Sequence, residues 1–285
     1  MSKFLEALAD FVDKQDFDII RASEIIGEGE PETLDLIPAN RCQDGYSVAK
    51  AFTLTAVGLA YDKGIMSPDE KIVDIFADEL PESGMDERWN MNTVDYALNF
   101  RIGLSSHAFD IDVEPYRTYG DNFLHYIMTC PLVYEPGTER RYGDGAYYLL
   151  ARAIEKKTGI SLEEFLRDNL KPLEFGEFAW SHCPQGHVMG ATGLHLHTED
   201  MAKLGMLWLR NGKVHGQRLL SEEFINLAKS REYCFYKDDS GKIMYKGGMC
   251  GQGVFVIYSQ NRTFAYSSYG GNTDKILEFA AVYED

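Results

Sequence analysis

A serine and a lysine three positions apart, in the stretch Ser47-Val48-Ala49-Lys50, stand at the head of an apolar run that predicts a helix over residues 51–60. Residues three apart share a face of a helix, so the hydroxyl and the amine are expected to lie side by side. Such a lysine can take the serine proton when burial or nearby positive charge lowers its pKa. The start of the helix also offers a backbone N–H to an oxyanion. The four residues alone are also typical of an ordinary N-cap followed by a solvated lysine.

Four further motifs follow in order and carry a resemblance to a known family. They are Tyr134-Glu135-Pro136-Gly137-Thr138, Tyr142-Gly143-Asp144, Gly190-Ala191-Thr192-Gly193-Leu194 and Gly248-Met249-Cys250-Gly251-Gln252. Together with the serine and lysine, they resemble the serine beta-lactamase and penicillin-binding-protein superfamily, and within it the class C-like branch of esterases, D-peptidases and amide hydrolases. The resemblance runs from about residue 42 to the C-terminus.

The resemblance implies catalytic roles for three residues. Ser47 stands in place of the nucleophile, and Lys50 in place of a general base or proton shuttle. Tyr142 stands where the branch carries a second catalytic group, which shares a proton with the lysine and serves the leaving group. The alternative for Tyr142 is a packed aromatic, since the chain contains 17 tyrosines.

Asp144 departs from the family pattern, because the branch usually carries Asn at this position. An ionised Asp only accepts hydrogen bonds, and a carboxylate near Lys50 would raise the lysine pKa and oppose its action as a base. Two interpretations stay open. Asp144 binds a cationic group such as a substrate amine, or the active site has drifted and turns over slowly.

The last motif also departs from the family pattern. Gly248–Gln252 contains neither Lys nor His, so the cation that holds the carboxylate of a beta-lactam in true lactamases is expected to be missing. Efficient beta-lactamase activity is therefore not expected. The backbone around Cys250 and Gly251 is predicted to bind the substrate by donating a second N–H to the oxyanion. Ile102 stands where the branch commonly carries Ser in a Thr-Ser-Gly motif.

Composition excludes several classes of partner. Lys and Arg number 28 against 45 Asp and Glu, a net charge of −17, which disfavours nucleic acids and anionic membranes. The first interpretation of this net charge is solubility. The weaker one is an acidic cleft that attracts a cationic substrate. We expect a small ester or amide as the partner, and the oligomeric state is left open.

The N-terminal segment and the cysteines predict a cytoplasmic location. Residues 1–12 show an amphipathic helix pattern with acids and no export-signal features. The five cysteines lack Cys-x-x-Cys spacing, as expected of free thiols. No cofactor and no metal are expected. The histidines and cysteine of one short segment fit no common zinc pattern: His182, Cys183, His187, His195 and His197.

The predicted fold class is α+β. Strands are expected at 17–22, 33–38, 254–258 and 263–268, helices dominate from residue 47 to about 208, and a last helix begins near residue 273. This order fits the family layout, an antiparallel sheet from both chain ends flanked by helices, with a helical insertion. We expect one catalytic domain over 1–285, with an α/β part at about 1–60 and 190–285 and a helical part at about 61–189.

Two functional hypotheses follow. The first is a serine hydrolase that forms an acyl-enzyme at Ser47 and cleaves a small ester or amide, including D-configured or acylated peptides. The second is a catalytically weakened relative that binds a ligand or partner in the old cleft, which the departures at Asp144 and Ile102 favour. Retention of Lys50 and Tyr142 together with the serine favours the first.

Overall fold

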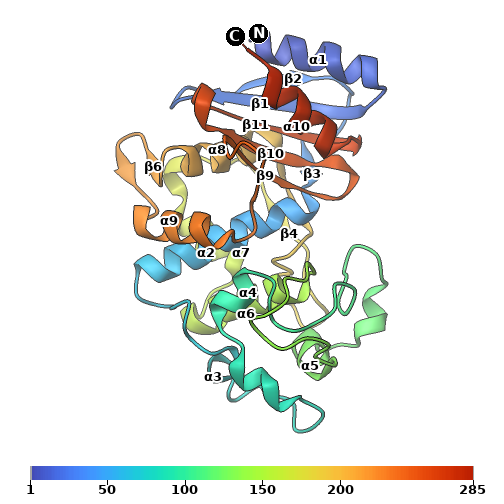
Figure 1. The fold of residues 1–285 in the computed structure, drawn as a ribbon, viewed down its shortest axis with the longest axis vertical. Helices are drawn as coiled ribbons and strands as arrows, with labels where there is room; N and C mark the ends of the chain where they lie inside the picture. The colour runs from blue at the N-terminus through green and yellow to red at the C-terminus, as the bar shows by residue number, and fades with distance from the viewer. Residues whose placement is uncertain (1, 285) are drawn as a thin grey trace.

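A six-stranded antiparallel sheet is assembled from both ends of the chain (Figure 1). The computed structural model describes residues 2–284, so Met1 of the predicted first helix and the outer limits, 1 and 285, of the predicted domain lie outside the described residues. In spatial order the strands are β2 (Glu32–Asp35), β1 (Asp18–Ile26), β11 (Arg262–Gly270), β10 (Gly253–Ile257), β9 (Ile243–Gly247) and β8 (Tyr236–Lys237).

Helices cover both faces of this sheet. α1 (Lys3–Gln15) and α10 (Thr273–Val282) pack on one face, and α8 (Thr198–Leu209) packs on the other. Strand β10 is buried throughout because its side chains alternate: Phe255 joins the α1 and α10 cluster, whereas Val254 joins the α8 cluster. Gly205 lets α8 approach closely, since a Cβ there would lie 3.2 Å from Val254 and Thr263.

The central helix α2 (Ala49–Asp62) has the six-stranded sheet and α8 on one side and the remaining, mainly helical part of the molecule on the other (Figure 1). Residues 49–60 are all buried, and the Trp208 ring N–H of α8 donates to the Thr55 hydroxyl. The other helices are α3 (Ile72–Ile75), α4 (Val94–Leu98), α5 (Phe123–Thr129), α6 (Gly145–Thr158), α7 (Leu162–Asn169) and α9 (Glu222–Arg231).

Short elements complete the chain. A three-stranded sheet has the order β3 (Cys42–Asp44), β5 (Leu194–His197), β4 (Ala179–Trp180), and β6 (Lys213–Val214) pairs with β7 (Gln217–Arg218). The 3-10 turns are η1 (Tyr46–Val48), η2 (Glu87–Met91), η3 (Tyr116–Tyr119), η4 (Lys171–Leu173), η5 (Met249–Gly251) and η6 (Tyr258–Gln260).

The predicted α+β class is confirmed, including the sheet built from both chain ends. β8, β9 and the small three-stranded sheet were not predicted, because these strands are short and mix polar with apolar residues. No helix within residues 2–284 is long and apolar enough to cross a membrane.

Candidate active site

Ser47 is presented by a constrained turn between β3 and α2. Tyr46, the residue before it, has a φ of 45°, a left-handed conformation that costs energy in a residue other than glycine. Two hydrogen bonds hold the turn: the Tyr46 N–H donates to the Asp44 carboxylate at 2.7 Å, and the Gly45 N–H donates to the Leu194 carbonyl at 2.8 Å. Ser47 is thereby fixed, half-buried, at the start of α2.

Lys50 is fully buried and uses all three of its N–H donors. They reach the Ser47 Oγ at 2.9 Å, the Asp144 Oδ1 at 2.7 Å and the Ala191 carbonyl at 2.9 Å. The predicted contact between serine and lysine is therefore present. Because the Ser47 oxygen accepts from Lys50, the serine's own proton must point toward another acceptor.

The Asp144 carboxylate is held between two donors of the protein. One oxygen pairs with Lys50, and the other accepts the Ile111 N–H at 3.0 Å. Burial favours a neutral lysine, but the charges of Asp144 and Tyr142 and the hydrogen bond to Asp144 raise the pKa of Lys50 above its ordinary value. The carboxylate thus lies where the sequence analysis expected it to favour the ammonium form of Lys50. A substrate amine could reach Asp144 only by competing with these donors, and its role in substrate binding stays a prediction.

The Tyr142 hydroxyl lies between two ammonium groups. Lys246 donates to it at 3.1 Å, and the Nζ atoms of Lys50 and Lys246 each lie 4.9 Å from the centre of its ring. Burial tends to raise the pKa of Tyr142, but Lys50, Lys246 and the Ser47 hydroxyl together hold this pKa below its ordinary value. The structure thus places the three predicted catalytic residues together.

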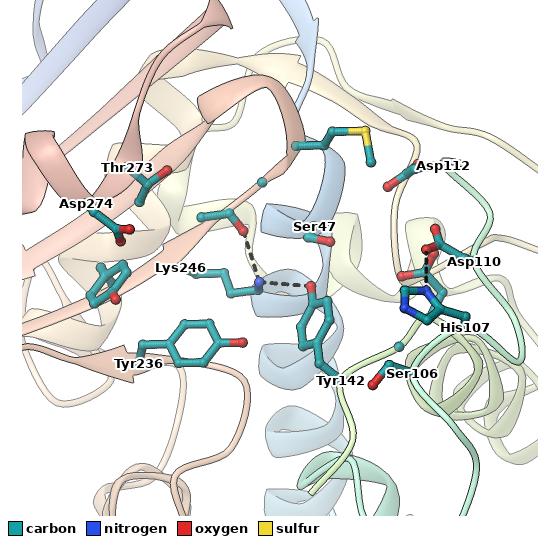
Figure 2. Close-up of a pocket in the computed structure, with 16 residues that line it drawn as sticks. Ser47, Ser106, His107, Asp110, Asp112, Tyr142, Tyr236, Lys246, Thr273 and Asp274 are labelled. Atoms are coloured by element: carbon teal, nitrogen blue, oxygen red, sulfur yellow. Dashed lines mark hydrogen bonds and ion pairs between the residues drawn. The ribbon is translucent and has the colours of Figure 1, made fainter. Parts of the chain in front are cut away.

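Lys246 corrects the expectation that the cleft lacks a cation. It stands at the end of β9, two residues before the segment taken as the last motif, and its amine enters the cleft (Figure 2). The strand end packs directly on the nucleophile turn, because a Cβ on Gly248 would lie only 2.4 Å from the Gly45 carbonyl oxygen. The substrate-facing part of this motif is therefore Lys246–Met249.

Cys250 and Gly251, predicted to bind substrate, are not among the residues that line the cleft. Gly251 has a φ of 84° and packs against Gly271, whose carbonyl oxygen would lie 2.4 Å from a Cβ at this position. Cys250 is exposed in the same turn. The part of these two residues in substrate binding stays a prediction.

The cleft in front of Ser47 has a volume of about 550 Å³. Lys246, Thr273 and Asp274 lie on one side of the serine, and Asp112, Asp110 and His107 lie on the other (Figure 2). The complete lining is Ser47, Ser106, His107, Asp110, Asp112, Tyr142, Gly143, Asp144, Tyr236, Tyr245, Lys246, Gly247, Gly248, Met249, Thr273 and Asp274.

Sequence reasoning missed the acidic side of the cleft. Asp110 and Asp112 lie in a polar loop without a periodic pattern, and the clustered aspartates and histidine were its only signal. None of the histidines between residues 182 and 197 is in the lining. His187, for example, contacts the Glu155 carboxylate instead. Across residues 2–284, no cluster of three or more His, Cys, Asp or Glu side chains has a geometry that could hold a metal ion.

Comparison with known proteins identifies the family and supports the fold. Residues 37–276 match the model of the beta-lactamase family. Three solved structures resemble the fold. A family VIII carboxylesterase is 17% identical over 98% of this chain and 96% of its own, with a TM-score of 0.74. A penicillin-binding protein from Bacillus halodurans is 16% identical over 97% of this chain and 100% of its own, with a TM-score of 0.69. A protein from Bacillus anthracis assigned as a 6-aminohexanoate-dimer hydrolase is 14% identical over 96% of this chain and 79% of its own, with a TM-score of 0.77. No curated protein matches the chain.

Proposed function

We propose that this chain, which belongs to the beta-lactamase family, is a serine hydrolase that forms an acyl-enzyme at Ser47 and cleaves a small ester or amide. The observation that carries the proposal is the position of the Tyr142 hydroxyl, flanked by Lys50 and Lys246 beside the serine. Two structural neighbours, named as a carboxylesterase and a 6-aminohexanoate-dimer hydrolase, are consistent with ester or amide substrates.

Tyr142 is the proposed base in the acylation step. As a phenolate it takes the Ser47 proton while the serine Oγ attacks the carbonyl carbon, and it then gives that proton to the leaving group. Deacylation follows the reverse sequence. Tyr142 takes a proton from a water molecule while the water oxygen attacks the acyl carbon, and it then returns the proton to Ser47 Oγ as the acid leaves. Lys50 stays an ammonium throughout, because its pKa is raised, and so it positions the serine oxygen instead of acting as the base.

Two backbone N–H groups can stabilise the oxyanion. Both Ser47 and Met249 line the cleft, and neither N–H donates a hydrogen bond to another group of residues 2–284. Ser47 precedes α2 and Met249 follows β9, and because both residues border the same cleft we assign both N–H groups to an entering carbonyl oxygen. Met249 therefore takes the place that the sequence analysis gave to the backbone near residue 250.

Acylation by p-nitrophenyl acetate tests the proposal. After an acid quench, intact-protein mass spectrometry should show one acetyl adduct on the wild type and none on Ser47→Ala. Ser106→Ala is the matched control, because it removes the other serine hydroxyl of the same cleft and should keep the adduct. An equal adduct on the wild type and Ser47→Ala would remove Ser47 from the mechanism.

Beta-lactam hydrolysis is a second candidate function, favoured by Lys246. The argument against it was the missing cation, and the structure places an ammonium in the cleft. Nitrocefin turnover, compared with turnover of the acetate ester, decides between the two. A binding protein without turnover is the remaining alternative, and labelling by a fluorophosphonate would speak against it because only an activated serine reacts.

A further inference from the structure

We propose that Asp112 determines specificity by binding a protonated amine on the acyl part of the substrate, so that the preferred substrates are aminoacyl esters or amides. This inference rests on the proposed function of the same cleft and names its substrate class. It moves the amine site that the sequence suggested at Asp144 to a different carboxylate.

The first argument is the charge of the cleft. Four aspartates line it: Asp110, Asp112, Asp144 and Asp274. Within the described lining they face a single lysine, Lys246, which already donates to the Tyr142 hydroxyl and to the Gly247 carbonyl. The Asp144 charge is matched by Lys50 behind it. Negative charge is therefore in excess where the substrate enters, and it favours a cationic group.

The second argument is how Asp112 is held. The Thr192 hydroxyl donates to its Oδ1 at 2.7 Å, and the carbonyl of the same threonine accepts the Trp180 ring N–H at 2.9 Å. The preceding residue, Ile111, is fixed by its bond to Asp144. Within residues 2–284, no Lys, Arg or His pairs with Asp112, so its second oxygen can accept a hydrogen bond from a ligand. A fixed carboxylate without a cationic partner suits a protonated amine.

The third argument is the direction of the reaction. The Tyr142 oxygen, which passes the proton to the leaving group, accepts a hydrogen bond from Lys246, so we assign the leaving group to the Lys246 side of the serine (Figure 2). The acyl group must then extend across Ser47 to the opposite side, where Asp112 lies. Asp110 lies there too, but its Oδ2 is already 3.9 Å from the His107 ring.

A matched pair of substrates tests the inference. Alanine p-nitroanilide carries the amine, and propionyl p-nitroanilide replaces it by hydrogen. For the wild type at pH 7, kcat/KM should favour the alanine compound, in either enantiomer, by about ten- to a hundredfold, the ratio expected for one charge-assisted hydrogen bond. Asp112→Asn, which can still accept from Thr192, should lose most of this preference. Asp274→Asn, an equal loss of charge on the other side of the cleft, should keep it.

A binding readout separates this inference from the proposed hydrolysis. In the Ser47→Ala background, alaninamide should bind more tightly than propionamide, and adding Asp112→Asn should abolish the difference. If the wild type is not acylated but the binding preference is present, the proposed hydrolase activity is wrong and the amine site at Asp112 stands. Normal acylation by p-nitrophenyl acetate, with the same substrate preference in the wild type and Asp112→Asn, would overturn the role of Asp112. Loss of the preference in Asp274→Asn alone would assign the amine to the opposite side.

Discussion

Replacing Lys246 by alanine is the most direct test of the proposed base. The lysine Nζ lies 3.1 Å from the Tyr142 oxygen, so the substitution removes one of the two ammonium groups that hold the pKa of Tyr142 below its ordinary value. Lys50 remains, but its charge is largely matched by the Asp144 carboxylate at 2.7 Å. Tyr142 should therefore hold its proton to higher pH in the variant.

The size of the effect follows from the distance. An opposite charge within about 4 to 6 Å moves a titration by roughly one to three pH units. Below the pKa of the base, each pH unit lowers the phenolate fraction about tenfold, so kcat/KM at pH 7 should fall between about tenfold and a thousandfold. Lys246→Arg keeps a positive charge at the strand end and should recover part of the rate.

The assay is kcat/KM for p-nitrophenyl acetate as a function of pH. In the wild type kcat/KM should rise with pH through the pKa of Tyr142, because only the phenolate accepts the serine proton. In Lys246→Ala the same rise should occur at higher pH, and in Tyr142→Phe the rise should disappear. A lower rate in Lys246→Ala with an unmoved pH profile would refute the argument, since it would mean that the lysine only binds substrate.

Three further predictions concern Asp144, Gly248 and Asp112. Asp144→Asn leaves Lys50 buried without its counter-charge, so the free energy of unfolding should fall by about 3–5 kcal/mol in denaturant titrations; an unchanged midpoint would contradict this. Gly248→Ala should lower kcat about a hundredfold and also lower the melting temperature, because its Cβ would push the Gly45 carbonyl of the backbone and displace the nucleophile; wild-type kinetics would show that the turn adapts. Burial, together with the charges of Asp144 and Asp44, raises the pKa of Asp112 to about 6. The Thr192 hydrogen bond and the charge of Lys50 act in the opposite direction. The carboxylate is charged above that pKa and neutral below it, so the preference for alanine p-nitroanilide should decline as the pH falls through about 6, and a preference that persists at pH 4.5 would contradict the assignment.

Local spacing explains which parts of the site could be predicted. The contact between Ser47 and Lys50 is set by helical geometry alone, and it is present at 2.9 Å. Tyr142 and Asp144 were found through resemblance, because nothing local indicates that residues about ninety positions after the lysine return to it. The role of Lys50 as a base could not be judged without the 2.7 Å distance to Asp144.

Pairing between distant segments explains what was missed. Lys246 faces the cleft because β9 pairs with β10 in a register that sets Lys246 opposite Val254. A five-residue strand with one charge does not reveal that register in the sequence. The small sheet escaped prediction for the same reason, since it depends on the pairing of Asp44 with His195. The long strands near the chain ends and the helices up to residue 208 carry stronger periodic patterns and were predicted, whereas α9 was not.

The pairing of β1 with β11 has a consequence for how the protein is made. Seven consecutive residues of β1 are buried, and the strand lies between β2 and β11. While the chain emerges from the ribosome, residues 27–261 must be translated before the partner on the β11 side appears. Through that interval the nascent chain exposes a strand with one open edge and the apolar side chains of Ile19, Ile20, Ala22 and Ile25, which invites association with other chains. Chaperone demand should therefore fall sharply once β11 has emerged, and catalytic competence can arise only after that point.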